Sequence, residues 1–90
     1  MEPISTDFTE GRFRYVQRVR TGDLAIYSQE HLASKTLRYE VIRIRIQREH
    51  TWSNGAVMPE QEAYPGSKFW GRYGFTCFTF DEAQKLLARL

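Results

Sequence analysis

Hydrophobic and polar positions alternate most clearly between residues 37 and 48. Isoleucine and polar residues alternate here, in the order Ile42, Arg43, Ile44, Arg45, Ile46 and Gln47. A period of two, together with β-branched side chains, is typical of a strand with one buried and one exposed face. The pattern therefore predicts a strand whose isoleucine face is covered and whose arginine face lies open to solvent.

A second alternating stretch predicts a hairpin before this strand. Residues 11–20 alternate, Thr21-Gly22 interrupts the pattern, and residues 23–29 resume it. A two-residue turn at Thr21-Gly22 places Arg20 opposite Asp23, as a cross-strand pair of opposite charge. In this register the open face of the hairpin carries Arg14, Arg18, Val16 and Tyr27.

The C-terminal residues carry the local signals of a strand followed by a helix. Residues 73–78 are dense in aromatic and β-branched side chains, which predicts the last strand. Thr79 and Glu82 have the spacing of a capping box. Apolar residues then recur with helical period, at Ala83, Leu86, Leu87 and Leu90. So short a helix needs a partner, and we expect it to pack on the isoleucine face.

Two further segments complete the predicted architecture. Residues 49–72 hold turn signals and four aromatic residues, and predict an ordered excursion at the sheet edge with a brief hairpin at Asn54-Gly55. Residues 1–10 are polar and acidic and predict a flexible N-terminal arm. Residues 11–90 form a single α+β domain, an antiparallel meander of three to four strands with one C-terminal helix on one face.

Composition narrows the cellular compartments in which we expect the protein. No apolar run approaches the roughly 20 residues of a membrane span, and the N-terminal sequence lacks the regions of a signal peptide. The one cysteine, Cys77, allows no intrachain disulfide, which fits a reducing compartment. We expect a cytoplasmic protein without a membrane partner.

Charge is distributed unevenly along the chain. The net charge is +2, but residues 11–48 carry +6 and the remainder −4. Ten of the thirteen basic residues are arginine, whose planar set of donors suits phosphate and carboxylate groups. A segment at residues 64–76, rich in glycine and aromatic residues, could add a recognition surface. The candidate binding residues are Arg12, Arg14, Arg18, Arg20, Tyr27, Arg43, Arg45 and Trp70.

A basic sheet face with interleaved aromatic residues is typical of proteins that bind single-stranded nucleic acid. Our leading hypothesis is a non-enzymatic protein whose arginine and tyrosine face engages nucleic acid without strong sequence preference. The alternative is a phage-type interaction module or inhibitor that binds an acidic protein with the same face. The competing interpretation of the basic face itself is a solvated strand surface whose arginines pair with neighbouring acids. For Trp70 the competing interpretation is that it closes one end of a small core.

Residue types for catalysis or metal binding are sparse. His31 and His50 are isolated, and no zinc-ligand spacing, nucleophile arrangement or phosphate-binding loop is present. We expect no catalytic residue, metal or cofactor.

Two stretches resemble known families. Residues 18–27, Arg-Val-Arg-Thr-Gly-Asp-Leu-Ala-Ile-Tyr, are similar to a strand pair of bacterial ribonuclease toxins from toxin–antitoxin pairs. That resemblance covers little beyond the hairpin and the following strand, and it implies ribonuclease activity as a third possibility. The Tyr-Glu-Val-Ile-Arg-Ile strand, with Tyr64-Pro65 and Trp70-Gly71, resembles small uncharacterised phage or prophage proteins over about residues 13–88. It brings no known activity, and it implies a small protein that binds a host or phage macromolecule.

Overall fold

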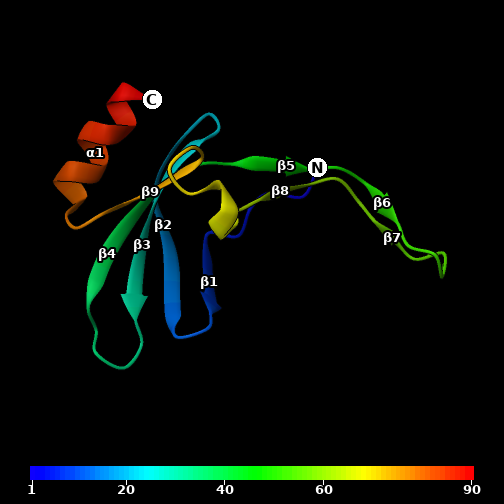
Figure 1. The fold of residues 1–90 in the computed structure, drawn as a ribbon, viewed down its shortest axis with the longest axis horizontal. Coiled ribbons are helices and arrows are strands. Elements are labelled where there is room, and N and C mark those ends of the chain that lie inside the picture. Colours follow the sequence, from blue (N-terminus) through cyan, green and yellow to red (C-terminus); the bar gives the residue numbers. More distant parts are fainter.

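The body of the protein is an antiparallel sheet of five strands in the spatial order β1-β2-β3-β4-β9 (Figure 1). The structure is a computed structural model and describes residues 1–90. The strands of this sheet are β1 (Asp7–Glu10), β2 (Phe13–Thr21), β3 (Leu24–His31), β4 (Leu37–Arg43) and β9 (Gly74–Cys77). The predicted α+β class and antiparallel meander are confirmed, and the sheet has one strand more than the most we expected.

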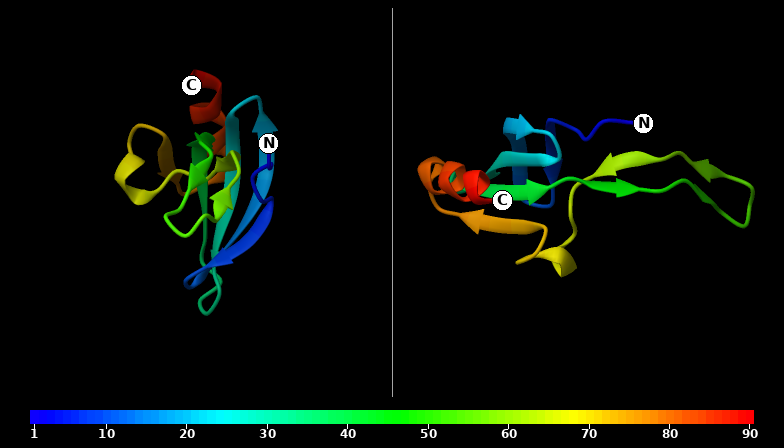
Figure 2. Two further views of the ribbon diagram at one scale, coloured as in Figure 1. Left: turned by 90° about the vertical axis from the view of Figure 1, so that its right-hand side faces the viewer. Right: turned by 90° about the horizontal axis from the view of Figure 1, so that it is seen from above.

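Helix α1 (Phe80–Arg89) covers one face of this sheet, against β3, β4 and β9 (Figure 2). It begins where the sequence predicts, because the Thr79 hydroxyl accepts a hydrogen bond from the Glu82 N–H at 3.1 Å. Its apolar stripe completes a helix-side cluster of buried residues, Ile26, Val41, Cys77 and Ala83. The helix therefore packs over Val41, and the prediction that it would cover the isoleucine face was wrong.

The opposite face of the sheet is covered as well, which corrects the prediction of an open face. An aromatic-side cluster buries Ile4, Ala25, Tyr27, Ile42 and Ile44, with Phe8, Tyr15, Tyr64 and Trp70 packed against it. Two adjacent residues of β4, Val41 and Ile42, are both fully buried. Segments far apart in the sequence supply this second cover, so the alternation within β4 gave no sign of it.

The β2–β3 hairpin forms in a different register from the predicted one. Its two-residue turn lies at Gly22-Asp23 instead of Thr21-Gly22, and Gly22 has a φ of 62°, a region that favours glycine. A bulge at Arg18 then shifts the register again, so that Gln17 pairs with Tyr27. Because an extra residue reverses the alternation, the β2 residues before the bulge lie on the face opposite to the expected one, so Tyr15 and Gln17 share a face with Tyr27 instead of with Ile26.

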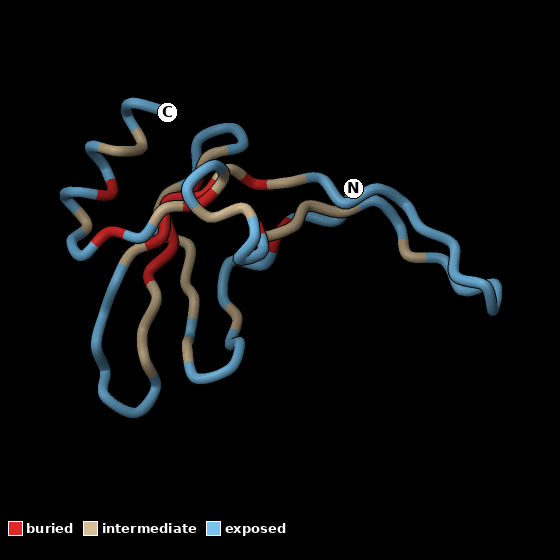
Figure 3. Tube along the Cα trace, viewed as in Figure 1, coloured by how far each residue is buried: buried red, intermediate tan, exposed pale blue.

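From Arg45 to Ala63 the chain leaves the sheet as a long hairpin, here called the arm. Its strands pair as β5 (Arg45–Gln47) with β8 (Gln61–Ala63) and as β6 (His50–Thr51) with β7 (Val57–Met58). The predicted hairpin at Asn54-Gly55 is confirmed as its tip, where the Trp52 N–H donates to the Ala56 carbonyl at 2.8 Å. The predicted packing at the sheet edge was wrong, because the arm projects from the sheet and is largely exposed (Figure 3).

The N-terminal residues belong to the fold, so the prediction that residues 1–10 are a flexible extension was wrong. Asp7–Glu10 is the edge strand β1, and Ile4, which is only 8% exposed, belongs to the aromatic-side cluster. After the arm, the chain returns to β9 through the short 3-10 helix η1 (Ser67–Phe69). No helix has both the length and the apolar character that crossing a membrane requires.

Candidate functional site

The arginines predicted to share one open face are divided between the two faces of the sheet and its turns. Three of them pair with acids, and in two of these pairs the acid lies on the neighbouring strand or in a turn. Arg14 pairs with Asp7 of β1 at 2.7 Å, and Arg43 pairs with Asp23 at 2.9 Å. These side chains are well exposed, so the pairs add little to stability, but they neutralise the charge that a polyanion would meet.

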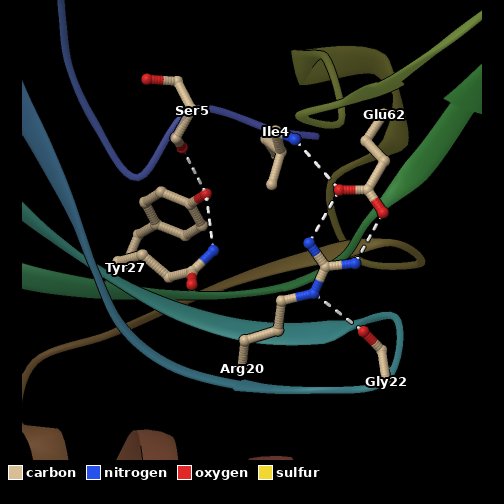
Figure 4. Close-up of polar contacts among 7 residues, drawn as sticks. Ile4, Ser5, Arg20, Gly22, Tyr27 and Glu62 are labelled. Atoms are coloured by element: carbon tan, nitrogen blue, oxygen red, sulfur yellow. Dashed lines mark hydrogen bonds and ion pairs between the residues drawn. The ribbon is translucent and has the colours of Figure 1, made fainter. Parts of the chain in front are cut away.

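Arg20 is held on the opposite side of the sheet from Arg43, at the base of the arm. Its guanidinium forms two hydrogen bonds with the Glu62 carboxylate, at 2.7 and 2.6 Å, and a third with the Gly22 carbonyl at 3.0 Å (Figure 4). The Arg20 guanidinium and the N–H of Ile4 lower the pKa of Glu62 to about 2. The predicted Arg20–Asp23 pair is therefore replaced by a pair with the arm.

The remaining predicted positions of β2 and its preceding turn have separate surroundings. The Arg18 side chain, at the bulge, donates to the buried Ser28 hydroxyl at 3.0 Å. Arg12 is exposed in the turn between β1 and β2. Neither residue lies beside Arg43 in the sheet, so the predicted basic face does not form.

Tyr27 was predicted as an exposed aromatic platform, and the structure corrects this. Its side chain is fully buried in the aromatic-side cluster. Its hydroxyl donates to the Ser5 carbonyl at 2.7 Å and accepts from the Gln17 side chain at 3.1 Å (Figure 4). A ring in this position has no face open to a nucleobase.

Trp70 is partly buried and closes one side of the aromatic-side cluster. Its indole N–H donates to the Thr76 hydroxyl at 3.0 Å. Its ring lies so close to Gly74 that a Cβ there would stand 2.4 Å from the ring carbon Cζ3. The interpretation of Trp70 as a core-closing residue agrees with this position.

Arg45 is the one predicted arginine that joins a group of unpaired cations. Its guanidinium carbon lies 3.7 Å from the ring centre of Phe69 and 4.9 Å from that of Tyr73. Two more cations lie against the same rings, Lys68 at 5.1 Å from Phe69 and Arg72 at 5.3 Å from Tyr73. We call these five residues the basic–aromatic cluster.

None of the three cations of the basic–aromatic cluster forms a salt bridge. Lys68 and Arg72 are exposed, and the two rings meet edge to face at 5.7 Å. A guanidinium stacked on a ring keeps its N–H donors in the plane, free for an anion. Lys68 and Arg72 were not among the predicted site residues, although each directly precedes an aromatic residue within the segment at 64–76.

The arm carries exposed apolar side chains. Trp52 is 52% exposed and Val57 is 56% exposed, while Trp52 contacts the His50 ring edge to face at 4.5 Å. Residues exposed in this way on a projecting element are candidates for contact with another macromolecule.

The side chains that most often bind metals lie apart in the structure. No three His, Cys, Asp or Glu side chains are placed to hold a metal ion. His31 Nδ1 accepts hydrogen bonds from the Ala33 and Ser34 N–H groups at 3.3 and 3.2 Å. Burial raises the pKa of the Cys77 thiol, which disfavours the reactive thiolate.

Comparison with known proteins found no matching family model, no matching curated protein and no matching solved structure. The resemblances to phage proteins and to ribonuclease toxins therefore stay predictions.

Proposed function

We propose that the protein is a non-enzymatic binding module that engages single-stranded nucleic acid through the basic–aromatic cluster. The observation that carries the proposal is the gathering of three unpaired cations, Arg45, Lys68 and Arg72, around two aromatic rings. Cations that follow the phosphates and rings that stack on bases are the usual elements of sequence-tolerant single-strand binding.

The proposed contact is smaller than the arginine face expected from the sequence. Arg14, Arg20 and Arg43 are paired with acids, which removes them from a shared cationic surface. Few phosphate contacts make the binding weak and only moderately sensitive to salt. Arg45 already lies over the rings of Phe69 and Tyr73. A nucleobase would therefore have to stack on the parts of these rings that Arg45 leaves uncovered, at the edge of the cluster.

A titration with a fluorescein-labelled oligothymidylate at low ionic strength tests this proposal. The double variant Lys68→Gln/Arg72→Gln should bind about tenfold more weakly or worse, because two phosphate contacts are lost. The matched control is Arg14→Gln/Arg43→Gln, which removes the same charge from paired positions and should change affinity much less. Equal losses in the two variants, or no binding by the unaltered protein, would reject the proposal.

A second candidate function is binding to a protein partner through the arm. The exposed side chains of Trp52 and Val57 favour it, since aromatic and apolar anchors concentrate binding energy at interfaces. The test is affinity capture from lysate after nuclease treatment, with a Trp52→Ser variant as control. A stoichiometric partner that is lost with Trp52→Ser supports this function.

The same proposal includes a cytoplasmic location. Its support is the single cysteine, a free buried thiol that fits a reducing compartment.

A further inference from the structure

A cleft of about 670 Å³ opens on the aromatic side of the sheet. It lies between the β1–β2 turn and the segment that leads into η1, and it is lined by Phe8, Tyr15, Glu40, Tyr64 and Trp70 among others. This volume falls within the range of sites that hold small molecules, which are mostly apolar with a few polar groups. The basic–aromatic cluster contributes none of its residues to the lining.

Glu40 is the buried charge of this cleft. It projects from the middle of β4 and is only 7% exposed. The Tyr64 hydroxyl donates to its Oε1 at 2.5 Å, which is the only hydrogen bond that the carboxylate receives from the protein. No buried polar side-chain atom lacks a partner, so the unbonded Oε2 is not sealed within the protein. Because Glu40 lines the cleft, this oxygen is available to a ligand there.

The protein provides no cation to balance Glu40. Burial raises the pKa of its carboxyl, and the Tyr64 hydrogen bond offsets this only in part. Burial and the adjacent Glu40 raise the pKa of Tyr64, so its hydroxyl stays protonated and serves as the donor. A glutamine could anchor Tyr64 equally well without a buried charge, so the carboxylate is a cost to folding that a bound cation would offset.

Aromatic rings form the rest of the wall. Phe8 stacks on Tyr15 with ring centres 4.9 Å apart, and Tyr64 meets both edge to face at 5.7 Å. The rings hold one another in place, and the negative face of an aromatic ring attracts an organic cation. At the rim, Glu10 and Arg12 are exposed and of opposite sign, which leaves Glu40 to set the charge within the cleft.

We propose that this cleft binds an organic ammonium ion, with Glu40 as its counter-charge and the rings of Tyr15, Tyr64 and Trp70 around it. The ion is a primary or methylated amine, either free or as the side chain of a lysine in a peptide. This inference is independent of nucleic-acid binding, since it uses another set of residues.

The first test compares a cation with a neutral molecule of similar shape. In a Trp52→Phe background Trp70 is the only tryptophan, so its fluorescence reports on the cleft. Titration with n-butylammonium, or with a short lysine-containing peptide, should give a saturable change, and n-butanol should give none. Tighter binding of the peptide identifies lysine as the source, and tighter binding of the free amine identifies a small molecule. Equal responses to butylammonium and butanol, or no saturable response to either cation, would overturn the proposal.

The second test removes the charge. Glu40→Gln keeps the volume and an acceptor for Tyr64, and should weaken butylammonium binding about tenfold or more, because a buried charge-assisted hydrogen bond is lost. Glu10→Gln removes a carboxylate from the rim and should have a small effect. Retained affinity in Glu40→Gln would overturn the proposal. If that variant fails to fold, the comparison of butylammonium with butanol on unaltered Glu40 stays decisive.

Discussion

Arg20 and Glu62 form a bidentate ion pair, with N–O distances of 2.7 and 2.6 Å, although they are 42 positions apart in the chain. The same carboxylate accepts a hydrogen bond from the Ile4 N–H at 3.0 Å. Glu62 therefore ties together three segments: strand β2, the N-terminal residues and the base of the arm (Figure 4). An arginine that the sequence assigned to ligand binding is thereby committed to the fold.

This pair predicts a loss of stability in acid. The pKa of Glu62 is about 2 in the folded protein and about 4.5 when unperturbed, so its ionised form favours the native state at higher pH. The stabilisation is complete above about pH 4.5 and disappears as the pH falls towards about 2. Urea unfolding should show Glu62→Gln to be less stable than the unaltered protein at neutral pH. The two should converge near pH 2, and an undiminished difference there would contradict the pairing.

The raised pKa of Glu40 predicts that its effect on stability changes with pH in the opposite direction to that of Glu62. Its raised pKa means that the folded protein holds the proton more tightly than the unfolded chain, so ionisation destabilises the native state as the pH rises above 4.5. Glu40→Gln should unfold at a higher temperature than the unaltered protein at neutral pH, and the gain should vanish below about pH 4.5. A Gln variant that is less stable at neutral pH would show that the carboxylate is needed for folding, not for a ligand.

The extent to which the fold followed from the sequence depends on how local each signal is. The capping residues of α1 lie within one turn of each other, and the Asn54-Gly55 hairpin depends on adjacent residues, so both could be predicted. The faces of β2 and β4 could not. The bulge at Arg18 is a register change with no local sequence signal, and Tyr64 comes from a segment more than twenty positions away from β4.

The capping of α1 predicts a moderate loss of stability on removing one hydroxyl. Thr79→Ala should lower the free energy of unfolding by about 1 kcal/mol, because the Glu82 N–H loses its acceptor. Thr79→Ser keeps a hydroxyl at the N-cap and serves as the matched control. Chemical denaturation measures both, and an equal loss in the serine variant would point away from capping.

Because Gly74 and Trp70 are in close contact, we expect substitutions at these two positions to have coupled effects on stability. Gly74→Ala would place a methyl group 2.4 Å from the Trp70 ring, and should cost about 1–3 kcal/mol of stability through overpacking. In a Trp70→Ala background the same substitution should cost much less, because the ring that it meets is gone. Unfolding free energies of the four proteins of this double-mutant cycle give the coupling. Additive losses would mean that the ring does not rest on Gly74.

The candidate site followed from the sequence only in part. Arg45 belonged to the predicted set and does join unpaired cations, but the alternation that selected it described a single open face that the fold does not have. Lys68 and Arg72 come from beyond the arm and meet Arg45 only because the chain returns to the base of β5. Their convergence is a property of the tertiary structure, and a pattern along one strand does not contain it.

The salt dependence of oligothymidylate binding tests the central claim most directly. If the three cations of the basic–aromatic cluster each neutralise one phosphate, the logarithm of the binding constant should fall with the logarithm of salt concentration with a slope of about −2. Lys68→Gln/Arg72→Gln should leave a slope of about −0.7, since about 0.7 is lost with each cation on a single strand, whereas Arg14→Gln/Arg43→Gln should leave the slope unchanged. A slope near −4, as a face of six arginines would give, or a slope that changes in the control but not in the cluster variant, would contradict the account.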